Sequence, residues 1–220
     1  MHTLAAQLAA FRESMLERAG PRTGAAVIAA YQAAIDAGLP DKAVQVGEVA
    51  PDFALPDCSG RVRRLSEALA GGPVVLVFYR GLWCPFCAMT LRAMDAIRPA
   101  LEREGATLLA LSPQDPARAR DGGACLGFGL TMLHDQGCEV AARYRVVWPV
   151  PENMRLLYAK FGHPLALENG DDGSVLPMPS AFVIRPDGVV AAAKVDPRPS
   201  VRMEPADALA AVRAMARVAA

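Results

Sequence analysis

The feature that most constrains the fold of this chain is an apolar run that ends in a close pair of cysteines. Residues 74–79, rich in β-branched and aromatic side chains, lead through Gly81 and Trp83 into Cys84 and Cys87. This pattern predicts a buried strand followed by a helix that begins at the cysteines. Two thiols three residues apart at a helix start lie on one face and can close a disulfide. The unpaired N–H groups of a first helical turn also favour a thiolate, so the pattern indicates thiol chemistry.

Length and charge exclude several classes of function. The chain has 220 residues and a formal net charge of zero, which suits one domain with an extension. It has no basic block to indicate nucleic-acid binding, and its apolar runs are too short to span a membrane. The N-terminus lacks a positive region and is typical of an amphipathic helix rather than a signal peptide. We therefore expect a cytoplasmic protein.

The remaining cysteines and the histidines do not form a recognisable disulfide or metal-binding pattern with Cys84 and Cys87. Reducing compartments disfavour structural disulfides, so a redox or metal role is expected for the close pair. Cys125 and Cys138 are interpreted as small buried hydrophobic residues, and Cys58 as a partly exposed turn residue. The alternative for the pair, half of a zinc site, needs two more ligands. No second C-x-x-C is present, and the histidines are scattered at positions 2, 134 and 163.

The first 42 residues are predicted to form a helical extension. Residues 3–19 and 23–37 have helical periodicity, broken by Gly20 and Pro21 and ended by the segment 38–41. Two roles fit this hairpin, covering the main domain or forming a homodimer contact. The expected organisation is an extension over residues 1–42 and an α/β domain over residues 43–220.

The first half of the domain contains a parallel unit. Residues 47–65 predict a β-hairpin with Arg61, Arg63 and Arg64 on a solvated face, and Ser66 is expected to cap a short helix. After the strand 74–79, a helix over residues 85–104 and a strand over residues 106–111 complete a strand–helix–strand unit with parallel pairing. The cysteine loop therefore lies at the carboxyl end of a strand, where sites in open α/β sheets gather.

The second half is predicted to end in an antiparallel hairpin and a helix. Strands over residues 179–184 and 189–195 flank an Arg-Pro-Asp-Gly turn, and a helix covers residues 204–219. The central sheet is therefore expected to be mixed and flanked by helices. The intervening region is expected to contain helices over 116–123, 139–144 and 152–161, a strand over 130–133, an extended segment over 148–151 and a turn over 170–173.

Five segments together resemble a known family. These are residues 47–53, 78–87, 111–114, 177–188 and 195–197. In this order and spacing the chain resembles the AhpC/TSA (redoxin) branch of the thioredoxin-fold superfamily, in particular bacterial peroxiredoxin-like proteins with a W-C-P-x-C motif. The resemblance implies a thioredoxin-like fold with an N-terminal helical extension and a thiol-dependent redox reaction. We expect no cofactor, and no metal because the further zinc ligands are missing.

The active loop departs from both better-known relatives. Relative to the P-x-x-x-T-x-x-C loop of standard peroxiredoxins, Arg80 stands at the proline position, Cys84 at the threonine and Cys87 at the peroxidatic cysteine. The position of the family's arginine before the late strand is occupied by Pro179, where thioredoxins have a cis proline. Trp83 before the first cysteine is also thioredoxin-like. The resemblance thus implies peroxiredoxin spacing with thioredoxin features.

Several roles remain open at this level. Cys84 is favoured for attack on disulfides, whereas for attack on peroxide Cys84 and Cys87 are not distinguished. Arg80 either stabilises a thiolate or is a solvated charge at a strand end. Trp83 either packs over the loop or is an ordinary core aromatic residue. Pro179 is expected to support the site through a cis bond.

The leading hypothesis is a thiol peroxidase that reduces hydrogen peroxide or organic hydroperoxides through a Cys84–Cys87 disulfide and is recycled by thioredoxin or a similar thiol reductant. The alternative is a thiol–disulfide oxidoreductase that acts on protein disulfides. A redox-sensing interaction module ranks third. The expected partners are a peroxide or disulfide substrate and the reductant, without nucleic acid or membrane.

Overall fold

A mixed five-stranded sheet forms the centre of the protein. The computed structural model describes residues 3–121 and 128–218, so the predictions for Cys125 and for the end of the helix expected over residues 116–123 lie outside the described residues. The strand order is β5-β4-β3-β8-β9. β3 pairs in parallel with β4 and β4 with β5, whereas β8 is antiparallel to both β3 and β9. The strands are β3 (Val74–Phe78), β4 (Thr107–Ser112), β5 (Thr131–His134), β8 (Ser180–Ile184) and β9 (Val190–Val195). The mixed sheet predicted from the sequence is confirmed.

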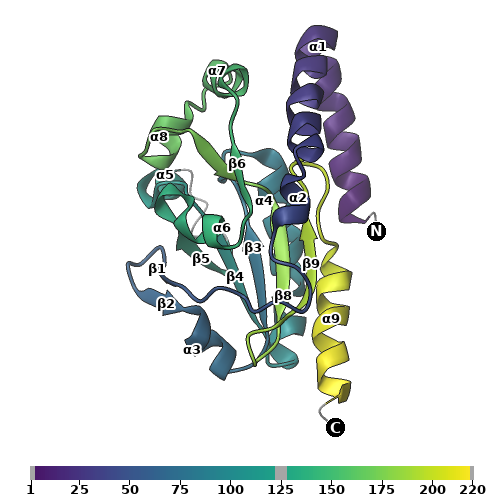
Figure 1. The fold of residues 1–220 in the computed structure, drawn as a ribbon, viewed down its shortest axis with the longest axis vertical. Helices are drawn as coiled ribbons and strands as arrows, with labels where there is room; N and C mark the ends of the chain where they lie inside the picture. The colour runs from purple at the N-terminus through teal and green to yellow at the C-terminus, as the bar shows by residue number, and fades with distance from the viewer. Residues whose placement is uncertain (1–2, 122–127, 219–220) are drawn as a thin grey trace.

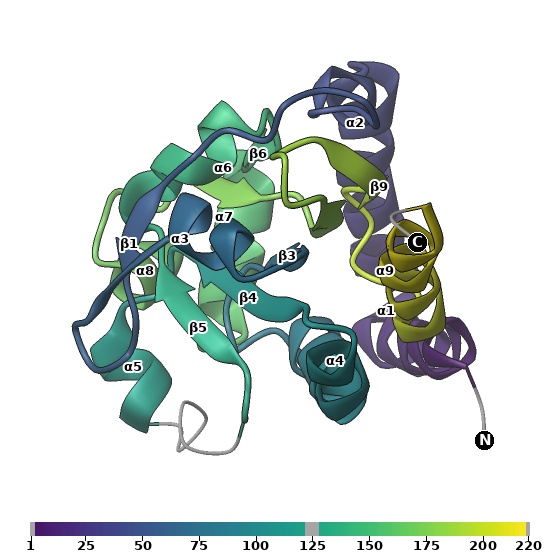
Figure 2. The same cartoon turned by 90° about the horizontal axis from the view of Figure 1, so that it is seen from below.

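Helices cover both faces of this sheet because its central strands are apolar on both sides. All five residues of β3 are buried, and so are all five of β8. Successive residues of a strand point to opposite faces. Val75 and Val77 accordingly pack with α4 (Pro85–Arg103) and α9 (Pro205–Val218), whereas Leu76 and Phe78 belong to the cluster on the other face. Figure 2 shows the sheet between these two layers.

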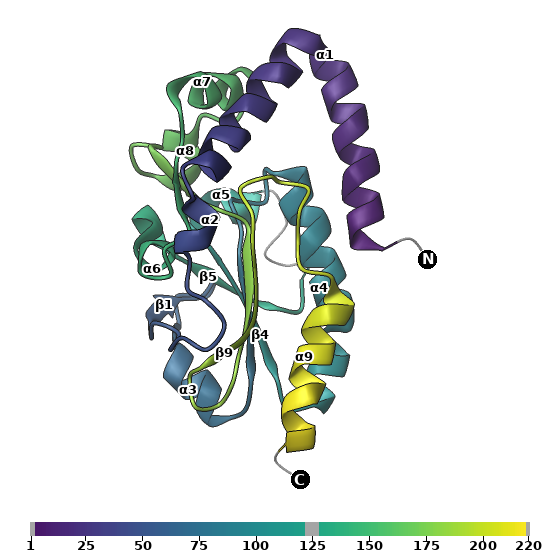
Figure 3. The same ribbon diagram turned by 45° about the vertical axis from the view of Figure 1, so that its right-hand side comes forward.

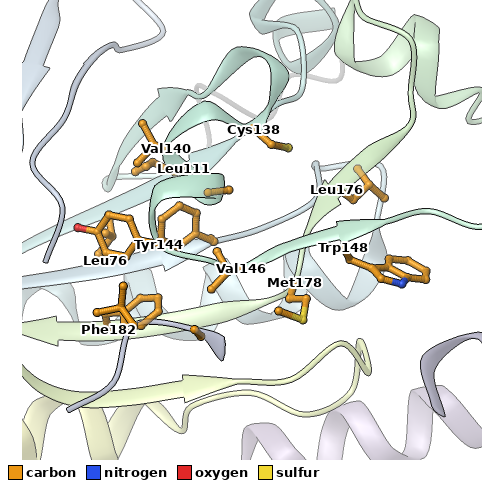
Figure 4. Close-up of a cluster of buried hydrophobic side chains, with 14 of the residues drawn as sticks. Leu76, Leu111, Cys138, Val140, Tyr144, Val146, Trp148, Leu176, Met178 and Phe182 are labelled. Atoms are coloured by element: carbon orange, nitrogen blue, oxygen red, sulfur yellow. The ribbon is translucent and has the colours of Figure 1, made fainter. Parts of the chain in front are cut away.

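The face away from α4 is filled by aromatic side chains. The rings of Phe78, Tyr144 and Phe182 lie in mutual contact, with centroids 5.1, 5.3 and 6.0 Å apart. Figure 4 shows Tyr144 and Phe182 beside Leu76, with Trp148 farther along the same cluster. Aromatic pairs at these separations add to the stability gained from burial. This cluster fixes the position of β3, whose end carries the cysteine loop.

A peripheral hairpin and a short helix follow the N-terminal extension. β1 (Ala54–Pro56) and β2 (Val62–Arg64) pair antiparallel, as predicted. Arg63 departs from the expected solvated face because its Nε donates to Asp57 at 2.9 Å. The prediction for Ser66 as a helix cap was wrong, since α3 (Leu65–Ala70) already begins at Leu65. The backbone N–H of Ser66 is satisfied by the carboxylate of Asp52 at 2.9 Å, so its own hydroxyl is not needed as a cap.

The N-terminal extension is a bent helix that reaches both faces of the sheet. α1 (Leu4–Asp36) bends at Gly20, which has φ +77°, immediately before Pro21. Figure 3 shows the two halves diverging from this bend. Leu8 of the first half packs with the α4 cluster, and Tyr31 of the second half packs with the opposite cluster. The predicted break at Gly20 and Pro21 is confirmed. A one-turn helix, α2 (Leu39–Lys42), follows it where the sequence predicted a helix stop.

The long connection between β4 and β8 contains several short elements, drawn in teal and green in Figure 1. Those that the sequence predicted are α5 (Pro116–Asp121), α6 (Glu139–Arg143), the extended β6 (Val147–Pro149) and α7 (Glu152–Lys160). It missed the 3-10 turn η1 (Gln136–Cys138), α8 (Leu165–Asn169) and β7 (Val175–Pro177). β7 pairs antiparallel with β6, and elements this short carry too few residues for a periodic pattern. Among the described residues, no helix is both long enough and apolar enough to cross a membrane.

Candidate active site

The two cysteines lie where β3 ends and α4 begins. Cys84 is the N-cap of α4, Pro85 occupies the first helical position, and Cys87 follows in the first turn. The backbone N–H of Cys87 donates to the Cys84 carbonyl oxygen at 3.0 Å. Cys84 is 5% exposed and Cys87 is fully buried. Neither cysteine forms a disulfide in this structure.

The two cysteine thiols differ in pKa. The Cys84 thiol donates to the Cys87 sulfur, and together with burial this raises the pKa of Cys84. Acceptance of that hydrogen bond lowers the pKa of Cys87 against the effect of burial, and the positive charge of Arg202 and the backbone N–H of Arg80 act in the same direction. The pKa of Cys87 is therefore lower than that of Cys84. Sequence reasoning left the order of the two sulfurs open, and this electrostatic arrangement favours Cys87 as the reactive thiolate.

Arg202 is a site residue that the sequence analysis missed. Its Nη2 donates to the Cys87 sulfur at 3.6 Å, from the segment that connects β9 to α9. It is 115 residues away along the chain and belongs to no recognisable motif. The only signal in the sequence was indirect, because the usual arginine position holds Pro179. Arg202 brings a positive charge to the same reactive group from another part of the fold.

Arg80 is buried beside the pair rather than solvated at a strand end. It is 1% exposed, and its guanidinium donates to the hydroxyl of Tyr31 at 2.8 Å and to the carbonyl oxygen of Pro197 at 2.8 Å. It also lies against the rings of Tyr31 and Trp148, at 5.1 and 4.9 Å. Burial opposes its charge, but the facing tyrosines and cysteines hold the pKa of Arg80 above its ordinary value. The structure therefore rejects the solvated alternative.

Trp83 packs over the loop, in keeping with the first of its two alternatives. Its ring stacks on His163 at a centroid distance of 5.5 Å and meets the edge of Tyr158 at 5.3 Å. A Cβ at Gly81 would lie 2.2 Å from the indole Nε1, so the loop needs a glycine there to accept the ring. Trp83 is partly exposed and lines a cavity that also contains Cys84.

A buried polar chain that sequence reasoning also missed supports this loop. The backbone N–H of Leu82 donates to the Gln114 side chain at 2.7 Å, and the Gln114 amide donates to Glu168 at 3.1 Å. The other carboxylate oxygen of Glu168 lies 3.2 Å from Nδ1 of His163. Gln114 ends a segment matched by the family resemblance, but nothing in the sequence pairs it with Glu168. These hydrogen bonds connect the cysteine loop to the end of β4 and to α8.

Pro179 lies at the site, but the expected cis bond is wrong. No peptide bond among the described residues is cis. A trans bond lets the chain run extended from β7 into β8, and the Pro179 carbonyl oxygen accepts from the N–H of Asp196 at 3.2 Å. Pro179 lines a cavity of about 10 Å³ together with Cys87 and Arg202. A cavity of this size has room for about one water-sized group.

Cys58 and Cys138 make no described contact with the cysteine pair. Cys138 is buried, and burial raises its pKa, in agreement with its interpretation as a small core residue. Cys58 is partly exposed, as predicted, with its sulfur 3.9 Å from the Met132 carbonyl oxygen. Within the described part of the chain, no three histidine, cysteine or acidic side chains gather in a way that could hold a metal ion.

The sequence was then compared with known proteins. A sequence model of the AhpC/TSA family matches residues 46–193, more than half of the 220 residues. The chain belongs to the AhpC/TSA family. This family membership and the mixed sheet with its helices confirm the thioredoxin-like fold expected from the resemblance. Both α1 and Arg202 lie outside the matched residues.

Individual relatives of this AhpC/TSA protein include a thiol-disulfide oxidoreductase and a peroxiredoxin. The thiol-disulfide oxidoreductase ResA of Geobacillus kaustophilus is 33% identical over 111 residues, which cover 50% of this chain and 62% of that protein. The chloroplastic peroxiredoxin Q of Oryza sativa subsp. japonica is 31% identical over 111 residues, covering 50% and 49%. The chain thus spans about half the length of the curated relatives it matches.

Solved structures with the same fold include peroxiredoxins. Peroxidoxin BcpB from Mycobacterium tuberculosis superposes with a TM-score of 0.60 at 26% identity, covering 78% of this chain and 98% of that one. The yeast mitochondrial 1-Cys peroxiredoxin superposes with a TM-score of 0.61 at 19% identity, covering 79% and 77%. The second comparison shows the fold alone.

Proposed function

We propose that this AhpC/TSA protein is a thiol peroxidase that reduces hydrogen peroxide or organic hydroperoxides through Cys84 and Cys87. The observation that carries the proposal is the convergence of donors on the Cys87 sulfur from the Cys84 thiol, Arg202 and the backbone of Arg80. A thiolate is the nucleophilic form of cysteine, and these donors stabilise it in a buried position. The small cavity beside Arg202 has room for a peroxide oxygen.

The proposed cycle begins with attack of the Cys87 thiolate on the terminal peroxide oxygen. The O–O bond breaks, Cys87 becomes a sulfenic acid, and the departing alkoxide or hydroxide takes a proton, which the Cys84 thiol can lose. The Cys84 thiolate then attacks the Cys87 sulfur, the S–O bond breaks, and the leaving hydroxide is protonated to water. The Cys84–Cys87 disulfide that results needs two electrons from a thiol reductant such as thioredoxin. The cytoplasm supplies such thiols, and we place the reaction there.

Arg80 and Trp83 have supporting roles in this proposal. Arg80 carries a buried positive charge near both sulfurs without a carboxylate among its described contacts, so the thiolate is its nearest compensating charge. Trp83 closes the loop over Cys84 and limits the access of water. Pro179 forms part of the wall of the small cavity beside Cys87.

The alternative function is thiol–disulfide exchange with a protein disulfide. It is favoured by Trp83 before the first cysteine, by the larger cavity next to Cys84 and by the likeness to ResA. In that reaction Cys84 would attack the substrate disulfide and Cys87 would release the product. The two functions differ in which cysteine reacts first.

A rapid-mixing experiment separates the two functions. The fully reduced protein is mixed with stoichiometric peroxide, and oxidation is followed by tryptophan fluorescence beside matched samples of Cys84→Ser and Cys87→Ser. We expect rapid oxidation of the wild type, none in Cys87→Ser, and a sulfenic acid trapped by dimedone in Cys84→Ser. A wild-type reaction no faster than that of a small free thiol would reject the peroxidase, and insulin reduction would then test the alternative.

A further inference from the structure

The two cysteines line separate cavities of very different size. Cys87 and Arg202 line the cavity of about 10 Å³, whereas Cys84 lines one of about 360 Å³. A volume of this order is typical of pockets for small molecules. The cavity beside Cys84 therefore has room for an organic molecule, whereas the cavity beside Cys87 has room for about one water-sized group.

The large cavity, which we call the Cys84 pocket, is walled by the N-terminal extension. Phe11 and Met15 from the first half of α1 and Val27 from the second half line it, together with Leu157 of α7 and its C-cap residue Phe161. α1 bends at Gly20 between these two sets of residues, so the bend shapes the pocket. Because α1 lies outside the residues matched by the family, one wall of this pocket comes from the extension and the other from the common domain.

Polar groups lie at the cysteine end of the Cys84 pocket, and Arg18 and Thr23 of α1 add two more near the bend. Arg80 and Tyr158 line the cysteine end, beside Trp83. Arg80 Nε and Trp83 Nε1 are buried and have no hydrogen-bond partner within the described residues. An apolar wall with donors at the cysteine end suits a molecule with an apolar body and an electron-rich head group, such as a thiolate.

The acidity of the two sulfurs decides which one an incoming thiol attacks. After the peroxidase cycle the pair is a disulfide, and exchange is faster when the departing thiol is the more acidic one. Attack on Cys84 makes Cys87 the leaving group, and Arg202 and the N–H of Arg80 then stabilise its thiolate. Attack on Cys87 would have to pass through the 10 Å³ cavity and would expel the less acidic Cys84.

We propose that the Cys84 pocket admits a low-molecular-weight thiol with an apolar body, which reduces the Cys84–Cys87 disulfide by attack on Cys84. The inference rests on the disulfide cycle of the proposed function and names its reductant. The thiolate sulfur of the reductant bonds to Cys84, the Cys84–Cys87 bond breaks, and Cys87 leaves as a thiolate. A second thiol, as its thiolate, then attacks the reductant sulfur of this mixed disulfide. The two reductant molecules leave as one symmetrical disulfide, and Cys84 is released as a thiolate that takes up a proton.

The test isolates the reductive half of the cycle. The protein is oxidised with diamide, so that no peroxide reaction is required, and is mixed with benzyl mercaptan or 2-mercaptoethanol, two thiols of similar acidity. We expect benzyl mercaptan to reduce the wild type at least about tenfold faster, since burial of an aromatic group in an apolar pocket favours its binding. Ala19→Phe, which places a ring in the Cys84 pocket, should abolish this preference. Ala10→Phe, on an exposed face of the same helix, should keep it.

Several results would overturn the inference. Equal rates for the two thiols with the wild type, or an unchanged preference in Ala19→Phe, would show that the pocket does not select the reductant. If Ala19→Phe fails to fold by circular dichroism, Thr23→Phe fills the pocket from the other half of α1. Faster reduction by thioredoxin than by benzyl mercaptan at equal thiol concentration, unaffected by the filling variant, would assign recycling to a protein.

The oxidative half-reaction separates this inference from the proposed function. We expect hydrogen peroxide, which is small enough for the cavity beside Cys87, to react with Ala19→Phe at the wild-type rate. Slower reaction with cumene hydroperoxide alone would make the pocket a peroxide site and overturn the inference. Slow reaction of the wild type with every peroxide would reject the peroxidase, while the thiol preference of the diamide-made disulfide would still decide the role of the pocket.

Discussion

At the scale of single residues, the chemistry of the cysteine pair depends on which charges surround each sulfur. Cys84 and Cys87 are both buried, and burial alone would raise the pKa of both. The pKa of Cys87 is instead lowered, because its sulfur accepts a hydrogen bond from the Cys84 thiol and lies 3.6 Å from Arg202 Nη2. Residue types at the motif therefore do not determine reactivity, since the same two cysteines without Arg202 would hold their protons more tightly.

The first prediction concerns Arg202→Met. Loss of the positive charge removes a contact that stabilises the thiolate, so the pKa of Cys87 should rise. Once this pKa exceeds 7, the rate of reaction with peroxide at pH 7 should fall by about tenfold for each further pKa unit. The wild-type rate should stay level from pH 7 to 8.5 because Cys87 is already ionised, whereas the rate of the variant should climb with pH. Thiolate absorbance at 240 nm reports the pKa directly.

The control is Arg213→Met, which removes an exposed arginine paired with Glu104. Equal titration curves for the two variants would contradict the role assigned to Arg202.

At the scale of elements, the positions of β3 and β4 depend on a close backbone approach. Gly72, two residues before β3, has φ +145°, and a Cβ there would lie 2.2 Å from the carbonyl oxygen of Gly105, which precedes β4. A backbone atom cannot swing away as a flexible side chain can. The parallel pairing that carries the cysteine loop therefore needs a glycine at this position.

The second prediction is that Gly72→Ala lowers the free energy of unfolding by about 3 kcal/mol, because the clash adds to the cost of the positive φ. Gly60→Ala is the matched control, since Gly60 also has a positive φ, of +84°, but has no neighbouring atom within 4 Å of the added Cβ. That variant should lose only about 1 kcal/mol. Urea unfolding of the reduced proteins measures both values. Equal losses would mean that the clash is relieved by a small shift of the strands.

At the scale of the whole molecule, the first turn of α1 is joined to the segment that precedes α9. The Glu204 carboxylate accepts from the backbone N–H groups of Leu4 at 3.1 Å and Ala5 at 2.6 Å, and so caps the first turn of α1. Glu204 follows Arg202 by two residues, so one short segment contacts both Cys87 and the helix that walls the Cys84 pocket.

The third prediction is that Glu204→Ala loosens the first half of α1. Its first N–H groups lose their acceptor, which should cost about 1 kcal/mol and speed amide hydrogen exchange over residues 4–19. Exchange in β3 and β8, at the centre of the sheet, should not change. Glu13→Ala, on an exposed face of the same helix, is the control. Exchange that rises equally in both variants would show that Glu204 does not hold the helix.

The sequence alone determined the local structure and the reactive pair. Apolar runs predicted β3, β4 and β8, and the C-x-x-C at a helix start predicted where the thiols lie, because both signals are contained within a few neighbouring residues. Only the tertiary structure decided which of the two sulfurs is the more acidic and which cavity adjoins the other. Arg202 lies 115 residues from Cys87, and the Cys84 pocket is walled by α1 and α7, so these properties depend on packing between distant segments that leave no periodic pattern.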